Sequence, residues 1–345
     1  MSTINTALLS YGMSGRVFHA PFVDLHPGFE LSGCWERSKK RINERYPSVR
    51  SYDALDELLA DQSIDLVVVN TPTLTHYEYA KKVLESGKHA VVEKAFAGSA
   101  DEATELRDLA RENGVKLAVF QNRRWDSDFL SMQKVLQDGS LGDIVEANLA
   151  YHRFDPNLSP KRHKEEPSSG SGIVKDLGSH VIDQALVLFG LPRAVFADLA
   201  TTRQHSRVED YFDILLRYDD KRVHVKGGYF FRQPFPEFTL FGKKGCFIKV
   251  RADVQEPQLD AGMLPSDPDY GVEPAGNEGR LYTDAADEPV MVQAPPGNYM
   301  AFYDGVFRSI AEDREEPVTA ADGVRVMRVI DAASRSQRDG VVVTL

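Results

Sequence analysis

The sequence predicts an α/β protein with two folded domains. The first is a doubly wound parallel sheet over residues 1–122, and the second is an α+β domain with a largely antiparallel open sheet over residues 123–345. Short apolar runs alternate with longer amphipathic segments in the first part, which is the pattern of βαβ units. Alternating apolar and polar segments with short turns follow in the second part, which is the pattern of antiparallel strands. The chain has 345 residues, more than one hydrophobic core normally serves.

Five apolar runs in the first part predict strands that are buried on both faces of a parallel sheet. They cover residues 6–10, 30–35, 66–70, 90–93 and 116–120, and helices are expected in the gaps between them. The clearest helix start is Ser99, because Glu102 completes the pattern of a capping box. The same helix is expected to end at Gly114, since glycine suits the left-handed position after a helix.

The second part is expected to begin with a helix near 126–137 and a strand near 144–154. A polar loop, which we expect to be mobile, continues to residue 172 and precedes a helix over 173–189. Antiparallel strands are predicted over 194–202, 211–218, 222–231, 238–241 and 246–250. Residues 251–298 are dense in Pro, Gly and Asp, so we expect a long surface excursion there. Helices near 299–313 and 319–337 complete the chain and are expected to pack back on the first domain.

Composition excludes several classes of function. The formal net charge is -11 and the pI is near 5.4, which opposes binding to nucleic acid. No stretch approaches the roughly 20 apolar residues of a membrane span, and the start of the chain lacks the pattern of a secretory signal. Cys34 and Cys246 lie far apart, so a disulfide framework has no support. We therefore expect a cytoplasmic protein with no nucleic-acid or membrane partner.

A glycine turn follows the first predicted strand. Residues 10–15 fit the pattern G-x-G-x-x-G, with Ser10 in place of the first glycine. Such a turn lets backbone amides approach a pyrophosphate at the start of a helix and lets that helix pack close to the strand. Because a strand precedes it and a helix follows, we interpret it as the cofactor turn of a Rossmann domain. The predicted contacts are Gly12, Met13, Ser14 and Gly15.

The end of the second predicted strand bears on the choice of cofactor. Glu36 lies 21 positions after Gly15, where an acidic residue commonly binds the adenine ribose 2′-hydroxyl of NAD. Arg37 and Ser38 follow at once and suit the 2′-phosphate of NADP. The sequence therefore predicts NAD or NADP, with NAD slightly favoured, and a solvated turn is the alternative for these charged residues.

Other predicted strand ends carry further candidate cofactor contacts, because ligands of open parallel sheets bind beyond the carboxyl ends of the strands. For Thr71, Pro72 and His76, the alternative is a plain turn followed by a surface histidine. The candidates are Asn70, Thr71, Pro72, His76, Glu93, Lys94 and Asn122.

Three residues suit hydride transfer to or from an alcohol, which needs a base for the hydroxyl proton and positive charge near the oxygen. Lys94 can supply the charge and His180 the base. Asp176 stands four positions before His180 on a predicted helix, where a carboxylate favours the protonated imidazole. A structural helical ion pair is one alternative. A metal site ranks last because no further histidine or cysteine stands at ligand spacing, so no metal is predicted.

The joint pattern resembles the Gfo/Idh/MocA oxidoreductases, and the likeness spans nearly the whole chain. Residues 121–126 and 176–184 are similar to stretches of the inositol and sugar dehydrogenase branch, including the scyllo-inositol dehydrogenase type. The motifs that carry the resemblance are Tyr11-Gly12-x-x-Gly15, Phe18-His19-Ala20-Pro21, Thr71-Pro72-x-x-x-His76, Glu93-Lys94 and Asp176-x-Gly178-x-His180.

The resemblance implies that Lys94 contacts substrate and nicotinamide, and that His180, paired with Asp176, takes the hydroxyl proton. Ser10 departs from the family pattern, as does Ala95, which stands where proline usually follows the lysine. Arg123 and Trp125 are the further substrate contacts that we select. Salt bridges or domain packing are the alternative for both of them.

We hypothesise a dehydrogenase that moves a hydride between the nicotinamide and a secondary hydroxyl or keto group of an inositol or sugar-like polyol. Two alternatives stay open at this point: an NAD-dependent glycoside hydrolase of the same fold, and a non-catalytic sensor of sugar or cofactor. The expected partners are the small-molecule substrate and further copies of the chain, in a homodimer or homotetramer, since an exposed sheet face suits self-association.

Overall fold

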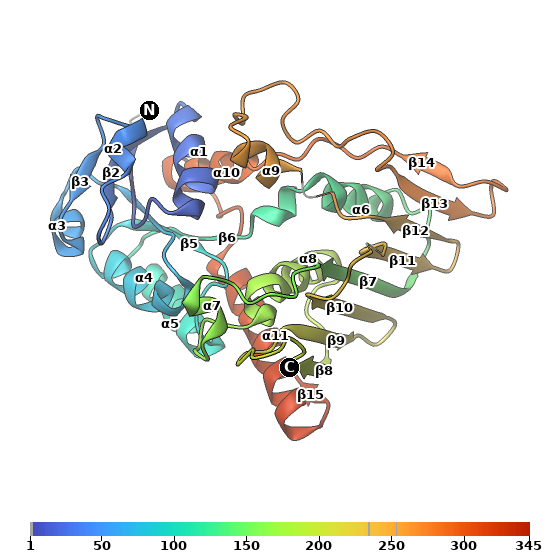
Figure 1. Ribbon diagram of the computed structural model, residues 1–345. Helices are drawn as coiled ribbons and strands as arrows, with labels where there is room; N and C mark the ends of the chain where they lie inside the picture. Colours follow the sequence, from blue (N-terminus) through green and yellow to red (C-terminus); the bar gives the residue numbers. More distant parts are fainter. Residues whose placement is uncertain (1–2, 234, 253) are drawn as a thin grey trace. The chain divides into compact units, whose positions relative to one another are not determined.

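The computed structural model describes residues 3–233, 235–252 and 254–345, which form two compact units (Figure 1). The first unit holds the described residues up to Asn122 together with Gln255–Tyr270 and Asn298–Val324. The second unit holds Arg123–Val254, Gly271–Gly297 and Arg325–Leu345.

The first unit contains a parallel sheet of six strands in the order β3-β2-β1-β4-β5-β6, the doubly wound order of a Rossmann domain. All five predicted strands are confirmed to within two residues. β3 was not predicted, because it is three residues long and only Tyr52 in it is buried. The strands are β1 (Ile4–Leu8), β2 (Phe29–Trp35), β3 (Arg50–Tyr52), β4 (Leu66–Val69), β5 (His89–Glu93) and β6 (Leu117–Phe120).

Helices cover this sheet. Helix α4 packs on α5 and contacts β4 and β5, whereas α1 contacts β2 and α10. Figure 1 shows α1 and α10 on one side of the sheet and α4 and α5 on the other. The helices are α1 (Ala20–Leu25), α2 (Ile42–Arg45), α3 (Leu55–Ala60), α4 (His76–Glu85), α5 (Ala100–Glu112), α9 (Gln255–Asp260), α10 (Met300–Ala311) and the first residues of α11 (Ala320–Asp339).

The predicted helix start at Ser99 is confirmed for α5, although the Glu102 carboxylate binds the N–H of Gly98 and not that of Ser99, as a capping box would have it. The Ser99 hydroxyl accepts a hydrogen bond from the backbone N–H of Glu102 at 3.2 Å. The Glu102 carboxylate in turn accepts from the N–H of Gly98 at 2.8 Å. Gly114 follows the helix with φ of +65°, the left-handed conformation that the sequence predicted.

The second unit contains a sheet of nine strands in the order β14-β13-β12-β11-β7-β10-β9-β8-β15. Its neighbours pair antiparallel except β7 and β10, which pair parallel, so the predicted largely antiparallel sheet is confirmed. The strands are β7 (Ile144–His152), β8 (Ala194–Ala200), β9 (Tyr211–Arg217), β10 (Arg222–Gly228), β11 (Phe238–Gly242), β12 (Gly245–Lys249), β13 (Gly279–Thr283), β14 (Val290–Val292) and β15 (Val343–Thr344).

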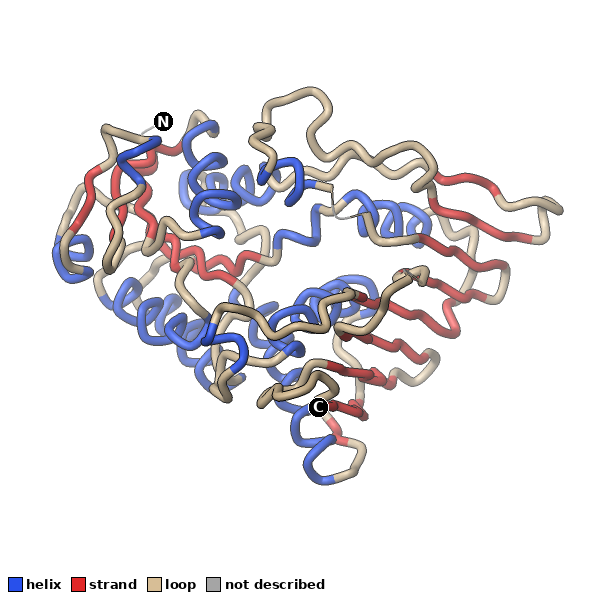
Figure 2. Tube along the Cα trace, in the orientation of Figure 1, coloured by secondary structure: helices blue, strands red, loops and turns tan. Residues whose placement is uncertain are grey.

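The helices of the second unit gather on one side of this sheet (Figure 2). Helix α6 (Ser127–Gln137) contacts β12, and α8 (Ser179–Phe189) contacts β7 and β10. The π-helical turn η4 (Val174–Gly178) precedes α8, so the continuous helix predicted over 173–189 begins with a π turn. No helix among the described residues has the length and apolar character that a membrane crossing requires.

Two sequence predictions for this half were wrong in part. The polar loop expected before residue 172 contains the short helix α7 (Arg162–Glu165). The excursion expected over 251–298 contains α9 and the hairpin of β13 and β14. The sequence pattern could not predict these elements, because each is at most six residues long and shows little apolar periodicity.

The sheet face opposite the helices carries partly exposed apolar side chains. On β11 the side chains of Phe238 and Leu240 are buried, so Phe241, which is 40% exposed, points to the opposite face. The strand register pairs Phe241 with Cys246, and Cys246 with Tyr282, which is 37% exposed. These three residues form a row across β11, β12 and β13, which we call the outer apolar row.

Candidate active site

The glycine turn lies between β1 and the π-helical turn η1 (Gly15–His19). A Cβ atom on Gly15 would lie 2.2 Å from the backbone oxygen of Ser10, so no larger residue fits without moving the main chain. The N–H of Gly12 donates to the Ser10 hydroxyl at 3.1 Å, and Gly12 itself is exposed. Ser10, which replaces the first glycine of the pattern, therefore supports the turn with its side chain.

A buried polar atom beside the turn fits a bound dinucleotide. Asn70 follows β4, is 5% exposed, and donates from its amide to the Ser10 oxygen at 2.8 Å. Its other amide atom, Oδ1, is buried and has no hydrogen-bond partner among the described residues. An unpaired buried acceptor is costly unless a ligand or water completes it. With the open backbone of Gly12, this geometry suits a nucleotide at the carboxyl edge of the sheet.

Glu36 lies at the predicted position, but its carboxylate is engaged within its own loop. Its Oε2 atom accepts a hydrogen bond from the backbone N–H of Ile42, the first residue of α2, at 3.0 Å. The neighbouring Arg37 and Ser38 are exposed. Glu36 was the reason for favouring NAD slightly over NADP, and one oxygen of its carboxylate is already used within the protein.

His76 is buried between two strand ends instead of lying on the surface. Its ring nitrogens lie 2.7 Å from the Thr71 oxygen, after β4, and 2.8 Å from the Ala95 oxygen, after β5. Burial lowers the pKa of His76, although the two backbone contacts oppose this shift. His76 thus connects the turn that contains Thr71 and Pro72 to the segment that contains Lys94.

Glu93 joins the glycine turn to the strand end that carries Lys94. Its Oε1 atom accepts hydrogen bonds from the Ser14 hydroxyl and from Nε2 of His19, the latter at 3.1 Å. Its Oε2 atom accepts from the backbone N–H of Lys94 at 3.2 Å. Three residues from two stretches of the chain, Ser14 and His19 after β1 and Lys94 after β5, therefore meet at one buried carboxylate.

The second unit carries the other predicted catalytic residues. His180 lies in the first turn of α8 and is 5% exposed, and its ring centre lies 6.4 Å from that of Tyr151 on β7. Asp176 lies in η4, where its Oδ2 atom accepts from the ammonium of Lys164 at 2.7 Å. Lys164 was not among the predicted residues, since nothing in the polar loop pattern distinguishes it.

Arg123 and Trp125 lie in the 3₁₀ turn η3 (Asn122–Trp125) before α6. The Arg123 guanidinium pairs with Asp126 at 3.2 Å and lies 5.4 Å from the centre of the Tyr151 ring. Its backbone oxygen accepts from Gln184 of α8 at 3.0 Å. Arg123 is therefore held beside the strand and helix that carry Tyr151 and His180, while Trp125 is half-buried and Asn122 is buried.

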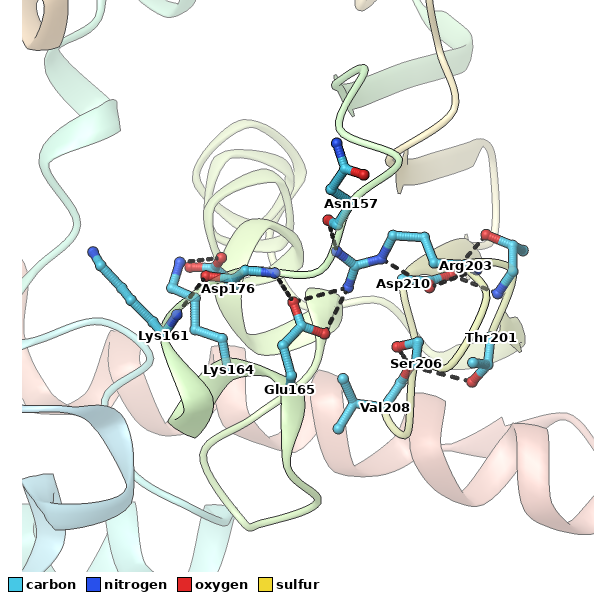
Figure 3. A network of polar contacts seen from close by, with 12 residues as sticks. Asn157, Lys161, Lys164, Glu165, Asp176, Thr201, Arg203, Ser206, Val208 and Asp210 are labelled. Carbon is cyan, nitrogen blue, oxygen red and sulfur yellow. Dashed lines mark hydrogen bonds and ion pairs between the residues drawn. The ribbon is translucent and has the colours of Figure 1, made fainter.

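A buried arginine fixes the segment that carries Lys164 (Figure 3). The Arg203 side chain is 4% exposed, and its Nη2 atom lies 3.0 and 3.2 Å from the two carboxylate oxygens of Glu165. Its Nε atom donates to Asp210 at 3.1 Å, and its Nη1 atom donates to the Asn157 oxygen at 2.9 Å. The loop that we predicted to be mobile is therefore attached at two points to one interior side chain.

Among the described residues, no group of three or more histidine, cysteine, aspartate or glutamate side chains is arranged to hold a metal ion. The residues that the sequence predicts to be catalytic lie in separate units, Lys94 in the first and Asp176 and His180 in the second.

The doubly wound sheet with its glycine turn, followed by an open mixed sheet, is the architecture of a protein with a nucleotide-binding Rossmann domain and a second α/β domain. The chain matches the family description "Oxidoreductase family, NAD-binding Rossmann fold" over residues 4–121 and "Oxidoreductase family, C-terminal alpha/beta domain" over residues 133–345. The chain belongs to the Gfo/Idh/MocA family of oxidoreductases.

Relatives cover nearly all of the chain. It is 36% identical over 341 residues to scyllo-inositol 2-dehydrogenase (NADP(+)) IolW of Bacillus subtilis, covering 98% of this chain and 95% of that protein. The solved structure of the oxidoreductase yvaA from Bacillus subtilis has a TM-score of 0.94 at 34% identity, covering 100% of this chain and 99% of that chain. An oxidoreductase structure from Bacteroides fragilis has a TM-score of 0.90 at 39% identity and full coverage of both chains.

These findings confirm the predictions of the family, of the fold class, of an enzyme in the dehydrogenase/reductase class, and of NAD or NADP as cofactor.

The Arg203 attachment can be tested with Glu165→Gln. Removing the charge of Glu165, which is 12% exposed, should lower the free energy of unfolding by about 2 kcal/mol, because a buried guanidinium loses one of its two carboxylate partners and keeps only Asp210. It should also accelerate amide hydrogen exchange over residues 157–166. Glu166→Gln is the matched control, since Glu166 pairs with Arg162 at the surface and its loss should cost less than about 1 kcal/mol. Equal effects of the two substitutions on stability and exchange would contradict the attachment.

Proposed function

We propose that this chain catalyses hydride transfer between NADP and a secondary hydroxyl or keto group of an inositol or sugar-like polyol. The observation that carries the proposal is the meeting of the glycine turn and the Lys94 strand end at Glu93. The relative named for scyllo-inositol 2-dehydrogenase activity supports the substrate class. The division near residue 122 then separates a cofactor domain from a domain that binds substrate.

The chain's own residues supply the proton chemistry of this proposal. When an alcohol is oxidised, its C–H hydrogen leaves as a hydride to the nicotinamide and its hydroxyl proton passes to the imidazole of His180. The Asp176 carboxylate favours the imidazolium that forms. The Lys94 ammonium donates a hydrogen bond to the oxygen that becomes the carbonyl, which stabilises the charge that develops there.

Two substitutions test these roles. Lys94→Ala and His180→Ala should each lower kcat at least about a hundredfold, the usual effect of removing a general acid or base, while leaving the Kd for the dinucleotide within about threefold. The assay follows reduction of NAD or NADP against a panel of inositols, aldoses and sugar acids. Lys82→Ala, at an exposed pair with Glu78, is the control and should retain activity. Full activity of both active-site variants would end the proposal.

We propose NADP as the preferred cofactor because the Glu36 carboxylate already accepts from the N–H of Ile42. Exposed Arg37 and Ser38 then offer a guanidinium and a hydroxyl to a 2′-phosphate.

Arg37→Ala should raise the KM for NADP about tenfold and change the KM for NAD little, since a charge-assisted hydrogen bond to the phosphate is lost. Steady-state kinetics with both nucleotides measure this difference. Arg50→Ala, which removes an exposed partner of Asp61, is the control. An equal rise for both nucleotides in the Arg37 variant would count against recognition of the 2′-phosphate.

We also propose that the chain forms a homodimer or homotetramer through the outer apolar row of Phe241, Cys246 and Tyr282. Burial of these side chains against a second copy would remove apolar surface from water.

Phe241→Glu should shift the sedimentation coefficient toward the monomer, because it places a charge in the middle of that contact. Leu25→Glu, at an exposed apolar residue of the first unit, is the control and should leave the assembly unchanged. A monomeric wild-type chain at micromolar concentration would exclude this assembly.

We propose a cytoplasmic location from the two free thiols, Cys34 and Cys246. Recovery of the native protein from an extracytoplasmic fraction would contradict that location.

A further inference from the structure

His19 lies in the stretch Phe18-His19-Ala20-Pro21, for which the sequence predicts no role. Its side chain is 0% exposed and lies between Glu93 of β5 and Tyr303 of α10. Nε2 lies 3.1 Å from Glu93 Oε1, and Nδ1 lies 2.6 Å from the Tyr303 hydroxyl. The ring also packs against Phe120 at 4.5 Å between ring centres. All four residues lie in the first unit.

The hydrogen bonds indicate which atoms carry protons. The Tyr303 hydroxyl donates its single proton to the Phe18 oxygen at 3.0 Å, so it accepts from Nδ1 of His19. Burial raises the pKa of Tyr303, so the phenol stays neutral and keeps that proton. The Glu93 carboxylate accepts from Nε2 at 3.1 Å. Both ring nitrogens of His19 therefore act as donors.

Glu93 is the acceptor in the ion pair with His19. Burial alone raises the pKa of Glu93, but the hydrogen bond and charge of His19, the Ser14 hydroxyl and the charge of Lys94 more than offset this, so the net shift is downward. A carboxylate that is ionised and 11% exposed lies directly behind the glycine turn. Without His19, the charge of Lys94 alone would offset its negative charge, and the carboxylate would repel a pyrophosphate that binds to the turn.

We propose that His19 is a positioning residue for the dinucleotide. Its imidazolium holds the Glu93 carboxylate in place and neutralises its charge. The pyrophosphate can then bind the backbone amides of the turn without repulsion from an uncompensated negative charge. This inference rests on the proposed function, because it assumes that the turn binds NAD or NADP. It adds a role for the interior of the cofactor domain, beyond the residues that line the glycine turn.

The same ion pair also fixes the two segments that Glu93 joins. Oε1 accepts from Ser14, at the start of η1, and Oε2 accepts from the N–H of Lys94. If His19 did not hold Glu93, the carboxylate could turn away from both segments. The glycine turn and the Lys94 segment would then lose their shared anchor.

The test is the Kd for NADPH, measured by fluorescence titration without substrate, so that it does not depend on which polyol is used. His19→Asn removes the donor to Glu93 and should raise the Kd at least about tenfold, as expected for the loss of a charge-assisted hydrogen bond. His19→Gln keeps a neutral donor near Glu93 and should show an intermediate effect. The His19→Gln variant also replaces His19→Asn in the Kd measurement if the Asn variant folds poorly.

A double substitution separates charge compensation from packing. In His19→Asn/Glu93→Gln the uncompensated carboxylate is gone, so the Kd should return to within about threefold of the wild-type value. His26→Gln is the matched control. His26 is a mostly buried histidine of the same unit that pairs with Asp304 at 3.2 Å, and its substitution should leave the Kd unchanged.

The outcomes distinguish this inference from the proposed function. If the wild-type chain binds neither NADPH nor NADH, the proposed function fails. If the wild-type chain binds and His19→Asn binds equally well, the positioning role of His19 is overturned while the function stands. A double variant no better than the single one would assign the effect of His19 to packing and would also overturn the inference.

Discussion

A buried carboxylate is the constraint on which the first unit depends. Glu93 accepts hydrogen bonds from the glycine turn, from the following helical turn and from the amide of Lys94. Parallel strands bring these segments to one edge of the sheet, but only side-chain contacts fix how each segment is oriented there. An ionised carboxylate in the interior needs polar partners, and His19 Nε2 lies 3.1 Å from Glu93 Oε1. The chemistry proposed for Lys94 therefore depends on His19, which lies 74 positions before Glu93 in the sequence.

The second unit also contains a buried charged side chain, and there the charge is positive. Arg203 is the buried ion there, and carboxylates from Glu165 and Asp210 surround it. Because Glu165 follows Lys164 in α7, the buried contact also limits where the Lys164 ammonium can lie, and that ammonium pairs with Asp176. In both units, a buried charged side chain with several polar contacts holds a segment that carries a candidate active-site residue.

The sequence predicted the parts of the fold that have a strong local signal. Five parallel strands consist of buried apolar runs, and Ser99 caps its helix as the pattern indicated. Elements without such a signal were missed. β3 has one buried residue, and β14 has three residues of which none is fully buried. These strands form because a neighbouring strand offers hydrogen-bond partners, which is a tertiary effect that periodicity does not report.

The candidate site shows the same limit. Spacing identified Glu36 but could not show that its carboxylate turns back to the N–H of Ile42. Lys164 carries no signal in sequence, since its importance comes from Glu165 reaching Arg203 across 38 positions of the chain. His19 stood in a motif, yet its partner Tyr303 lies 284 positions away. Contacts of this kind depend on the fold as a whole and cannot be derived from a local pattern.

The proposed reaction requires that Lys94 and His180 act on one oxygen of a polyol beside the nicotinamide. A crystal structure of the chain with NADP and an inositol or sugar that it oxidises measures this most directly. The account predicts that Lys94 Nζ and a ring nitrogen of His180 both lie within hydrogen-bond reach, about 2.6–3.2 Å, of the same substrate hydroxyl. A complex in which these two groups face different cavities, or contact different parts of the ligand, would contradict it.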